Sequence, residues 1–413
     1  MSEPAKNPGQ QPESFQPQKP EMMRALEEAQ GQTEAQGASQ ATSSSGGSGS
    51  IPGIHRLINS DGGENYWFNG CAAYVMEALG EPDYDYWFFA GLTGDNFAQV
   101  FARDHFRGNG VTDYRLSEAG GHRFIEDVFG TCGYASAFVT EKQFAADKGT
   151  YLRMLTGYID RGIPVIRHRW PVSSNQWGWG VFVGYENGGE TLLYITGDKT
   201  EPERIPLEEA LFDAAPESQQ SESGWIFVGE KKEQKNLRQI YRDAIINLPK
   251  LLTAKTDAYC FGSAAFRAWA AEVESGKFDS IKQKEFSSLA HNLYIVYVVN
   301  VATNSGGGWG FMDKAKELNP DFTFLEEVRR QYRTMGLLWW SKYKADDGFP
   351  EEYAKLHGGL PDNLEDLNAG IFHCKIKSLQ NPKKRAKVVA VIRQCADCMD
   401  EVVRIIEQGV KET

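Results

Sequence analysis

The spacing of apolar residues changes twice along this chain, and that change limits the folds open to it. Short β-prone runs lie at 163–170, 180–185, 191–196 and 224–228, separated by Gly, Pro and Asn. Before and after this region the apolar residues recur at helical spacing instead. Helices that precede a group of antiparallel strands are typical of an α+β fold. We therefore predict an α+β domain, helices first and antiparallel sheet after, followed by an all-α domain.

The expected helices fall into two groups. The first helix runs from Gly70 to Leu79, with Asn69 as its N-terminal cap and Gly80 as its stop. Two more helical patterns follow it, at 84–90 and 96–106. After residue 233 the helical segments are 236–252, 258–274, 285–302, 323–344 and 387–408. These segments predict a helical bundle.

Length and composition divide the chain into three parts. Its 413 residues exceed the roughly 250–300 at which a single core stops growing. Residues 1–50 are rich in Gln, Pro, Ser and Gly and end in a Ser/Gly linker. A linker of this composition is compatible with either a native or an engineered origin. Such a segment buries too little apolar surface to fold alone. We predict a disordered arm at 1–50, an α+β domain at 51–232 and a helical domain at 233–413.

Charge and targeting signals limit the partners. A net charge of −12 argues against nucleic acid and anionic membrane surfaces, which both need a basic field. No apolar run reaches the ~20 residues of a membrane span, and the first residues lack a secretory pattern. Six unevenly spaced cysteines then predict reduced thiols. We expect a cytoplasmic protein that binds neither nucleic acid nor membrane.

Cys71 occupies the position that most suggests chemistry. It stands in the first turn of a predicted helix, where the helix dipole and free amides favour a thiolate. The same amides would donate hydrogen bonds to an oxyanion, and Asn65 offers a side-chain amide nearby. The competing interpretation is a small buried side chain, which free cysteines often are.

Five motifs carry a resemblance to a known family. They are Asn65 to Cys71 (NYWFNGC), 84–87 (YDYW), 91–97 (GLTGDNF), 163–166 (IPVI) and 181–185 (VFVGY). Together they resemble the papain-like peptidase C39-like family, and within it the N-terminal domain of butirosin-biosynthesis-type acyltransferases and their uncharacterised bacterial relatives. The resemblance covers about 51–228 and extends weakly into 262–270. It implies a papain-like cysteine-peptidase fold.

The resemblance also implies site residues. In that family a cysteine nucleophile opens the central helix, a histidine begins the strand that ends in Gly-Tyr, and an acid or amide follows on the next strand. Cys71 and Asp198 match this pattern, whereas Gly178 stands where the family has its histidine. His168 is the candidate replacement, because pairing of 163–170 with 180–185 would bring it to the mouth of the same hairpin. A strand-end histidine bonded to backbone or water is the competing interpretation.

A surface for the substrate is indicated by tryptophans. Trp67, Trp170, Trp177 and Trp179 would converge on the cleft and stack against a sugar, amine or peptide, although an ordinary aromatic core fits them equally. The pair of cysteines at 395 and 398 has zinc-like spacing but lies inside a predicted helix, whereas structural zinc pairs usually lie on turns. We expect no metal and no other cofactor.

Two functions stay open. The first is a cysteine-dependent acyltransferase or amide hydrolase acting on a small-molecule, acyl-carrier or peptide substrate. Cys71 would attack a thioester or amide, His168 would be the base, Asp198 would orient it and Asn65 would bind the oxyanion. The second is a catalytically silent papain-like domain, a pseudoenzyme, that binds a small molecule or peptide in the Trp-rich cleft while the N-terminal arm recruits a protein partner.

Overall fold

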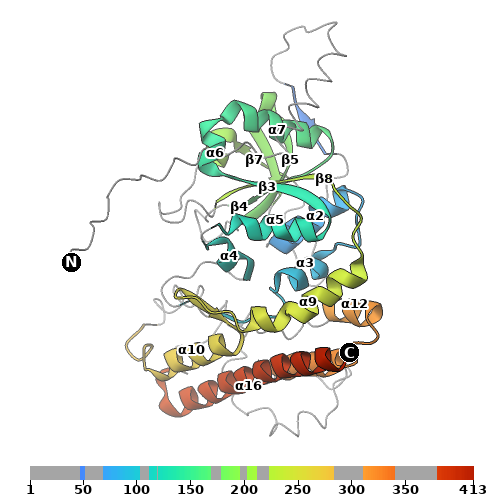
Figure 1. Cartoon of the computed structure of the whole chain (residues 1–413). Coiled ribbons are helices and arrows are strands. Elements are labelled where there is room, and N and C mark those ends of the chain that lie inside the picture. Colours follow the sequence, from blue (N-terminus) through green and yellow to red (C-terminus); the bar gives the residue numbers. More distant parts are fainter. Residues whose placement is uncertain are drawn as a thin grey trace, which may run out of the picture. The chain divides into compact units, whose positions relative to one another are not determined.

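The computed structural model describes residues 47–51, 68–102, 111–118, 120–168, 178–195, 202–211, 223–282, 310–339 and 379–413 (Figure 1). Its strands are β1 (Gly49–Ser50), β2 (Val100–Ala102), β3 (Tyr134–Thr140), β4 (Val165–His168), β5 (Trp179–Glu186), β6 (Thr191–Ile195), β7 (Glu203–Pro206), β8 (Gly224–Lys231) and β9 (Tyr259–Phe261). Its helices are α2 (Phe68–Ala78), α3 (Tyr86–Thr93), α4 (Val111–Leu116), α5 (His122–Thr131), α6 (Glu141–Ala146), α7 (Lys148–Asp160), α8 (Leu207–Ala210), α9 (Leu237–Leu252), α10 (Gly262–Glu274), α12 (Gly310–Leu318), α13 (Leu325–Trp339) and α16 (Pro382–Glu412), with a 3-10 turn η1 (Asn187–Gly189).

The main sheet is antiparallel throughout, with strand order β3-β8-β4-β5-β6-β7, and β1 pairs with β5 beside this path. The predicted hairpin of 163–170 with 180–185 is confirmed, since Val165 lies opposite Phe182 and His168 opposite Trp179. Helices and an antiparallel sheet together confirm the α+β class.

Helices cover both faces of the sheet. Alternate residues of a strand point to opposite faces, so neighbouring residues of β5 show what packs on each side. On one side Val181 of β5 belongs to the same hydrophobic cluster as Phe68 of α2. On the other side the Phe182 ring lies 4.7 Å from Trp225, which lies 4.9 Å from Phe144 of α6. The sheet is therefore the middle layer, with α2 on one face and α6 on the other.

Helix α2 begins two residues before the predicted start. Phe68 is its first residue, so Asn69 lies inside the first turn and the prediction that it caps the helix is wrong. The Asn69 side chain does not cap the helix because its amide donates a hydrogen bond of 2.9 Å to Asp95, 26 residues further along the chain. The predicted stop is confirmed, since Gly80 has φ of 81°, a left-handed conformation that favours glycine.

The predicted helix over 96–106 is wrong in its described part. Helix α3, predicted at 84–90, ends at Thr93 and is closed by Gly94, whose backbone N–H donates to Gly91. Residues Val100–Ala102 then pair as β2 with Tyr259–Phe261 as β9. That partner lies far along the chain, so local apolar spacing gave no sign of the strand.

Residues 120–160 depart most from the expected order. They hold α5, β3, α6 and α7, none of which the apolar pattern predicted. Because β3 comes before α6 and α7, the expectation that all helices precede the strands is wrong here. One overlooked signal is local, since Thr140 and Gln143 form a capping box at the start of α6.

The sheet begins earlier in the chain than expected. Residues 1–46 lie outside the described part, but Gly49 and Ser50 form β1 and pair with Tyr185 and Gly184. The end of the Ser/Gly stretch therefore belongs to the sheet, and the predicted boundary at residue 50 is a few residues too late.

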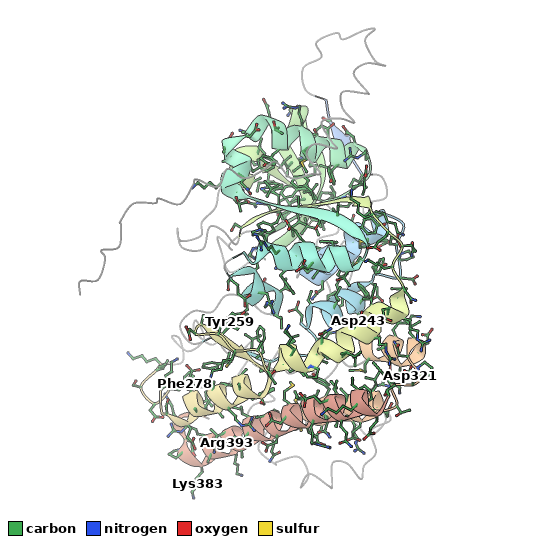
Figure 2. The ribbon with its side chains drawn as sticks, in the orientation of Figure 1. Asp243, Tyr259, Phe278, Asp321, Lys383 and Arg393 are labelled. Atoms are coloured by element: carbon green, nitrogen blue, oxygen red, sulfur yellow. The ribbon has the colours of Figure 1, made fainter. Side chains whose placement is uncertain are left out.

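After residue 233 the described chain is helical apart from β9, and α16 packs against α10, α13 and α9. The last helix buries an apolar stripe, in which Ile392, Cys395, Met399 and Ile406 are fully buried. Outside this stripe, Arg393 of α16, which is labelled in Figure 2, forms an ion pair with Glu274 of α10. The predicted segment 285–302 lies outside the described residues. None of the described helices is long and apolar enough to cross a membrane.

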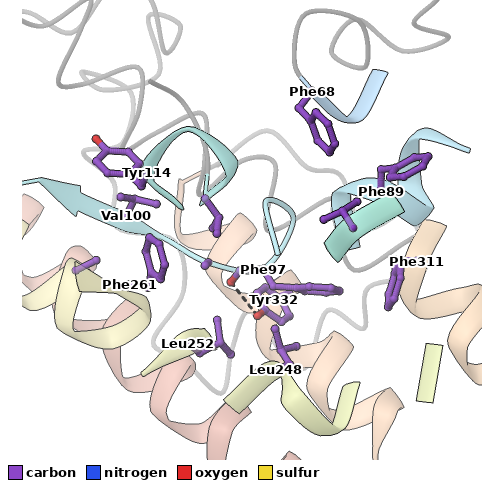
Figure 3. Close-up of a cluster of buried hydrophobic side chains, with 14 of the residues drawn as sticks. Phe68, Phe89, Phe97, Val100, Tyr114, Leu248, Leu252, Phe261, Phe311 and Tyr332 are labelled. Carbon is purple, nitrogen blue, oxygen red and sulfur yellow. Dashed lines mark hydrogen bonds between the residues drawn. The ribbon is translucent and has the colours of Figure 1, made fainter. Parts of the chain in front are cut away.

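The helical region packs directly on the segment that follows α3 (Figure 3). Tyr332 of α13 donates a hydrogen bond of 3.0 Å to the carbonyl of Phe97. The Phe97 ring lies 5.7 Å from that of Phe311 in α12. One hydrophobic cluster therefore continues from α2 and α3 into the helical region, and the division at residue 232 stays a prediction.

We predict that Gly262→Ala lowers the free energy of unfolding far more than Gly80→Ala. Both glycines have positive φ, so both variants bear the left-handed strain of about 1–2 kcal/mol. A Cβ at Gly80 meets nothing within 4 Å, whereas one at Gly262 would lie 2.1 Å from the backbone oxygen of Leu252. Urea unfolding of both variants measures the difference, and equal losses would contradict the packing described here.

Candidate functional site

Three side chains from separate elements meet at the end of β4. His168, the last residue of β4, lies opposite Trp179 of β5, and their ring centroids are 4.4 Å apart. Trp179 Nε1 donates a hydrogen bond of 2.8 Å to Asp113 Oδ1. The same carboxylate oxygen lies 4.0 Å from His168 Nε2. These three residues are called the His168 cluster below.

The His168 cluster is nearly buried but not sealed. The side chains of His168 and Asp113 are 9% and 13% exposed, while Trp179 is 3% exposed. Only a small part of the His168 and Asp113 side chains is therefore exposed. The 4.0 Å between His168 Nε2 and Asp113 Oδ1 is longer than a hydrogen bond.

Asp113 was not among the residues that the sequence singled out. It lies in the first turn of α4, a short helix that the apolar pattern did not predict. Residues 103–110, which precede this helix, lie outside the described part of the chain. An acidic residue is favourable there, because the N-terminus of a helix carries a partial positive charge. Only the tertiary fold brings this carboxylate to the end of β4.

A buried carboxylate, that of Asp95, fixes the elements around the cluster. Asn69 Nδ2 in α2 donates to Asp95 Oδ2 over 2.9 Å. Thr112 in α4 donates from its backbone N–H to Oδ1 (3.0 Å) and from its hydroxyl to Oδ2 (2.7 Å). Thr93 Oγ1, at the end of α3, lies 3.1 Å from both Asp95 Oδ2 and Asn69 Oδ1. We call these four residues the Asp95 network.

The Asp95 network holds in place the helices that carry residues of the candidate site. Asp95 is 2% exposed, so its hydrogen bonds replace water that the carboxylate has lost. Thr112 precedes Asp113 directly, and Asn69 lies two residues before Cys71. The network thereby holds the first turns of α2 and α4 relative to each other, and it fixes the positions of Cys71 and Asp113 in those turns.

The first turn of α2 lies next to the His168 cluster. Phe68, its first residue, packs against Trp179 with ring centroids 5.2 Å apart and against Phe129 of α5 at 5.9 Å. Cys71 lies one turn further along, so Phe68 and Cys71 share a face of the helix. Both side chains belong to the core between α2 and the sheet.

Cys71 itself has the properties of a core residue. Its side chain is 0% exposed, and burial raises the pKa of the thiol far above its ordinary value. Within the part of the chain that the structure describes, no imidazole or other group forms a hydrogen bond or ion pair with this thiol. The expectation of a readily ionised thiol at a helix N-terminus is therefore wrong for this conformation, because desolvation outweighs the helix dipole.

The other predicted site residues are distributed unevenly. Trp179 and His168 come together as described, whereas Asn65, Trp67, Trp170, Trp177 and Asp198 lie outside the described residues. Trp179 is a buried core residue, so little of its ring surface is exposed for a ligand to stack on. Cys395 and Cys398 are both buried in α16, and the described residues hold no group of three metal-ligating side chains.

Comparison with known proteins gives no family for the chain. No protein-family model matches it, and no curated protein matches its sequence. The assignment of function therefore rests on the geometry of the site.

We predict that Asp95→Ala unfolds in urea with a loss of at least about 3 kcal/mol. It leaves several buried donors without an acceptor, and each costs about 1–3 kcal/mol. The control is Asp257→Ala, which removes an exposed carboxylate and should change stability by about 0.5 kcal/mol or less. Similar losses in both variants would show that the Asp95 network does not hold the three helix ends.

We also predict that Cys71 is alkylated by iodoacetamide at neutral pH at least about 100-fold more slowly in the folded protein than in urea. The thiolate is the reactive form, and a raised pKa together with burial leaves little of it accessible. Peptide mass spectrometry measures the rate at each cysteine. Rapid native labelling of Cys71, with the fold intact by circular dichroism, would contradict this.

Proposed function

We propose that residues 51–232 form a papain-like domain without cysteine catalysis, and that this domain binds a polar small molecule or peptide at the His168 cluster. The order of a helix bearing the family cysteine, followed by an antiparallel sheet against which it packs, supports the papain-like part of the proposal. Residues 233–413 would be its helical companion domain.

One observation carries the loss of catalysis. The Cys71 thiol is 0% exposed, and burial raises its pKa. A nucleophilic cysteine needs the opposite, an accessible thiolate with a base within hydrogen-bond reach. The residue at the family's histidine position, Gly178, has no side chain with which to supply that base.

The His168 cluster offers the chemistry of a binding site instead. Asp113 accepts hydrogen bonds and the His168 imidazole donates or accepts them, while the buried rings of Trp179 and Phe68 pack behind these polar groups. A few convergent polar groups on apolar walls are typical of ligand sites. A ligand that donates hydrogen bonds, such as an amine, an amino sugar or the N-terminus of a peptide, is complementary to this set.

Acyl transfer remains the second candidate, because His168 is paired with a carboxylate. In that reading Asp113, 4.0 Å from Nε2, takes the orienting role that the resemblance assigns to Asp198. The Cys71 thiolate would attack a thioester carbonyl, the bond to the leaving thiolate would break, and His168 would return the proton to it. This chemistry requires a conformation in which Cys71 is exposed to both partners.

The proposal is tested by titrating the protein with monosaccharides, amino sugars and dipeptides while its thermal unfolding is followed. We expect at least one amine-bearing compound to raise the melting temperature. Asp113→Asn and His168→Ala should weaken its binding about 10-fold or more, which is about 1.4 kcal/mol per factor of ten. Cys71→Ala and the control His122→Ala, an exposed histidine, should leave it unchanged.

Incubation with acetyl-coenzyme A separates the two candidates. A binding domain gives no acyl adduct by intact mass spectrometry, in the wild type or in Cys71→Ala. An adduct on the wild type that disappears in Cys71→Ala and in His168→Ala would establish acyl transfer and overturn the proposed loss of catalysis.

A further inference from the structure

A pocket lies away from the His168 cluster. It is a pocket of about 640 Å³ between α9, the end of α3 and α5, and none of its lining residues belongs to the cluster. Its volume falls within the roughly 300–1,000 Å³ typical of small-molecule pockets. The pocket is therefore of a size to hold a small organic ligand.

The polar side of this pocket is one row of side chains on α9. Gln239, Asp243 and Asn247 are spaced four residues apart, so they share a face of the helix, and all three line the pocket. Gln239 Nε2 donates to Asp243 Oδ1 over 2.8 Å, and Asn247 Nδ2 donates to the Asp243 carbonyl over 2.8 Å. Figure 2 shows Asp243 on this helix. These bonds leave Asp243 Oδ2 and Asn247 Oδ1 to accept hydrogen bonds from a ligand.

The charges around the pocket favour a cation. The charged lining residues are Glu233, Lys235 and Asp243, and Lys235 forms an ion pair with Glu233. Outside the lining, Arg115 lies over the Phe124 ring but is 3.4 Å from Glu118. The carboxylate of Asp243 is thus the pocket's uncompensated charge among the described lining residues.

Apolar side chains also line the pocket. Phe124 of α5 and Leu92 of α3 are half-buried there, and Ile240 and Leu248 of α9 are buried. These side chains offer surface for the hydrocarbon part of a ligand, whose burial is favourable at about 25 cal/mol per Å². Thr93, which also lines the pocket, belongs to the Asp95 network, so this wall is held in place by buried hydrogen bonds.

We propose that this pocket binds a small amphipathic amine. Its ammonium group donates to Asp243 Oδ2 and Asn247 Oδ1, and its aromatic or alkyl part lies against Phe124 and Leu248. This pocket shares no lining residue with the His168 cluster, so its ligand does not depend on the function proposed for that cluster.

Isothermal titration with tryptamine and with tryptophol tests the proposal, because these probes share an indole ring and differ in the ammonium group. In the Asp113→Asn background, which impairs the other site, tryptamine should bind at least 10-fold more tightly than tryptophol. Adding Asp243→Asn should abolish that preference, and adding Asp257→Asn, an exposed control, should retain it.

Filling the pocket provides a second variant. Ala244, which lines it and is half-buried, becomes a bulky side chain in Ala244→Trp, and this variant should bind neither probe while its circular dichroism stays native. Equal binding of tryptamine and tryptophol, or tryptamine binding unaffected by both Asp243→Asn and Ala244→Trp, would overturn the proposal. Loss of binding in Asp113→Asn alone would instead place the amine at the His168 cluster.

Discussion

The arrangement around the candidate site depends on one buried carboxylate. Asp95 accepts hydrogen bonds from the first turn of α2 and from the first turn of α4, and it lies beside the last residue of α3. A carboxylate that has left water is tolerated only when such donors replace its solvation. The cost of leaving any donor unpaired is what makes the relative positions of the three helix ends specific.

This constraint explains why a cysteine at a helix N-terminus is not by itself a nucleophile. The network holds α2 against the sheet, with Phe68 packed on Trp179, and this packing encloses Cys71 completely. A helix dipole stabilises a thiolate by about 0.3–1 kcal/mol at a typical exposed site. Burial acts in the opposite direction and is the cause of the raised thiol pKa. The same framework leaves 9% of the His168 side chain and 13% of the Asp113 side chain exposed at the end of the sheet.

Elements with a strong local pattern could be predicted from the sequence, and elements defined by distant partners could not. The hairpin of β4 and β5, the stop at Gly80 and the apolar stripe of α16 follow from residue spacing alone. Strand β2 could not be predicted, because its partner β9 belongs to the helical half. The GLTGDNF motif carries a family likeness in the sequence, whereas its physical role in the structure is to supply Thr93 and Asp95 to the Asp95 network.

The candidate site shows the same division. Cys71 and His168 were singled out by residue type and by position in a helix and a strand, and the structure places both on the α2 side of the sheet. Asp113 was missed because a carboxylate in a short, unpatterned helix has no local signature. The sequence is compatible with a buried Cys71 as well as with a nucleophile, and the close packing of Phe68 on Trp179 of the sheet decides between them.

The central claim, that Cys71 is a buried core thiol, is tested most directly by a titration of cysteine labelled with ¹³C at Cβ. The Cys71 resonance is assigned by its loss in Cys71→Ala. Its chemical shift should remain that of a thiol up to at least about pH 10, well above the ordinary thiol pKa of about 8.5, because burial raises its pKa. A transition to thiolate with a midpoint below about pH 7 is typical of activated cysteines, and that result would contradict the account.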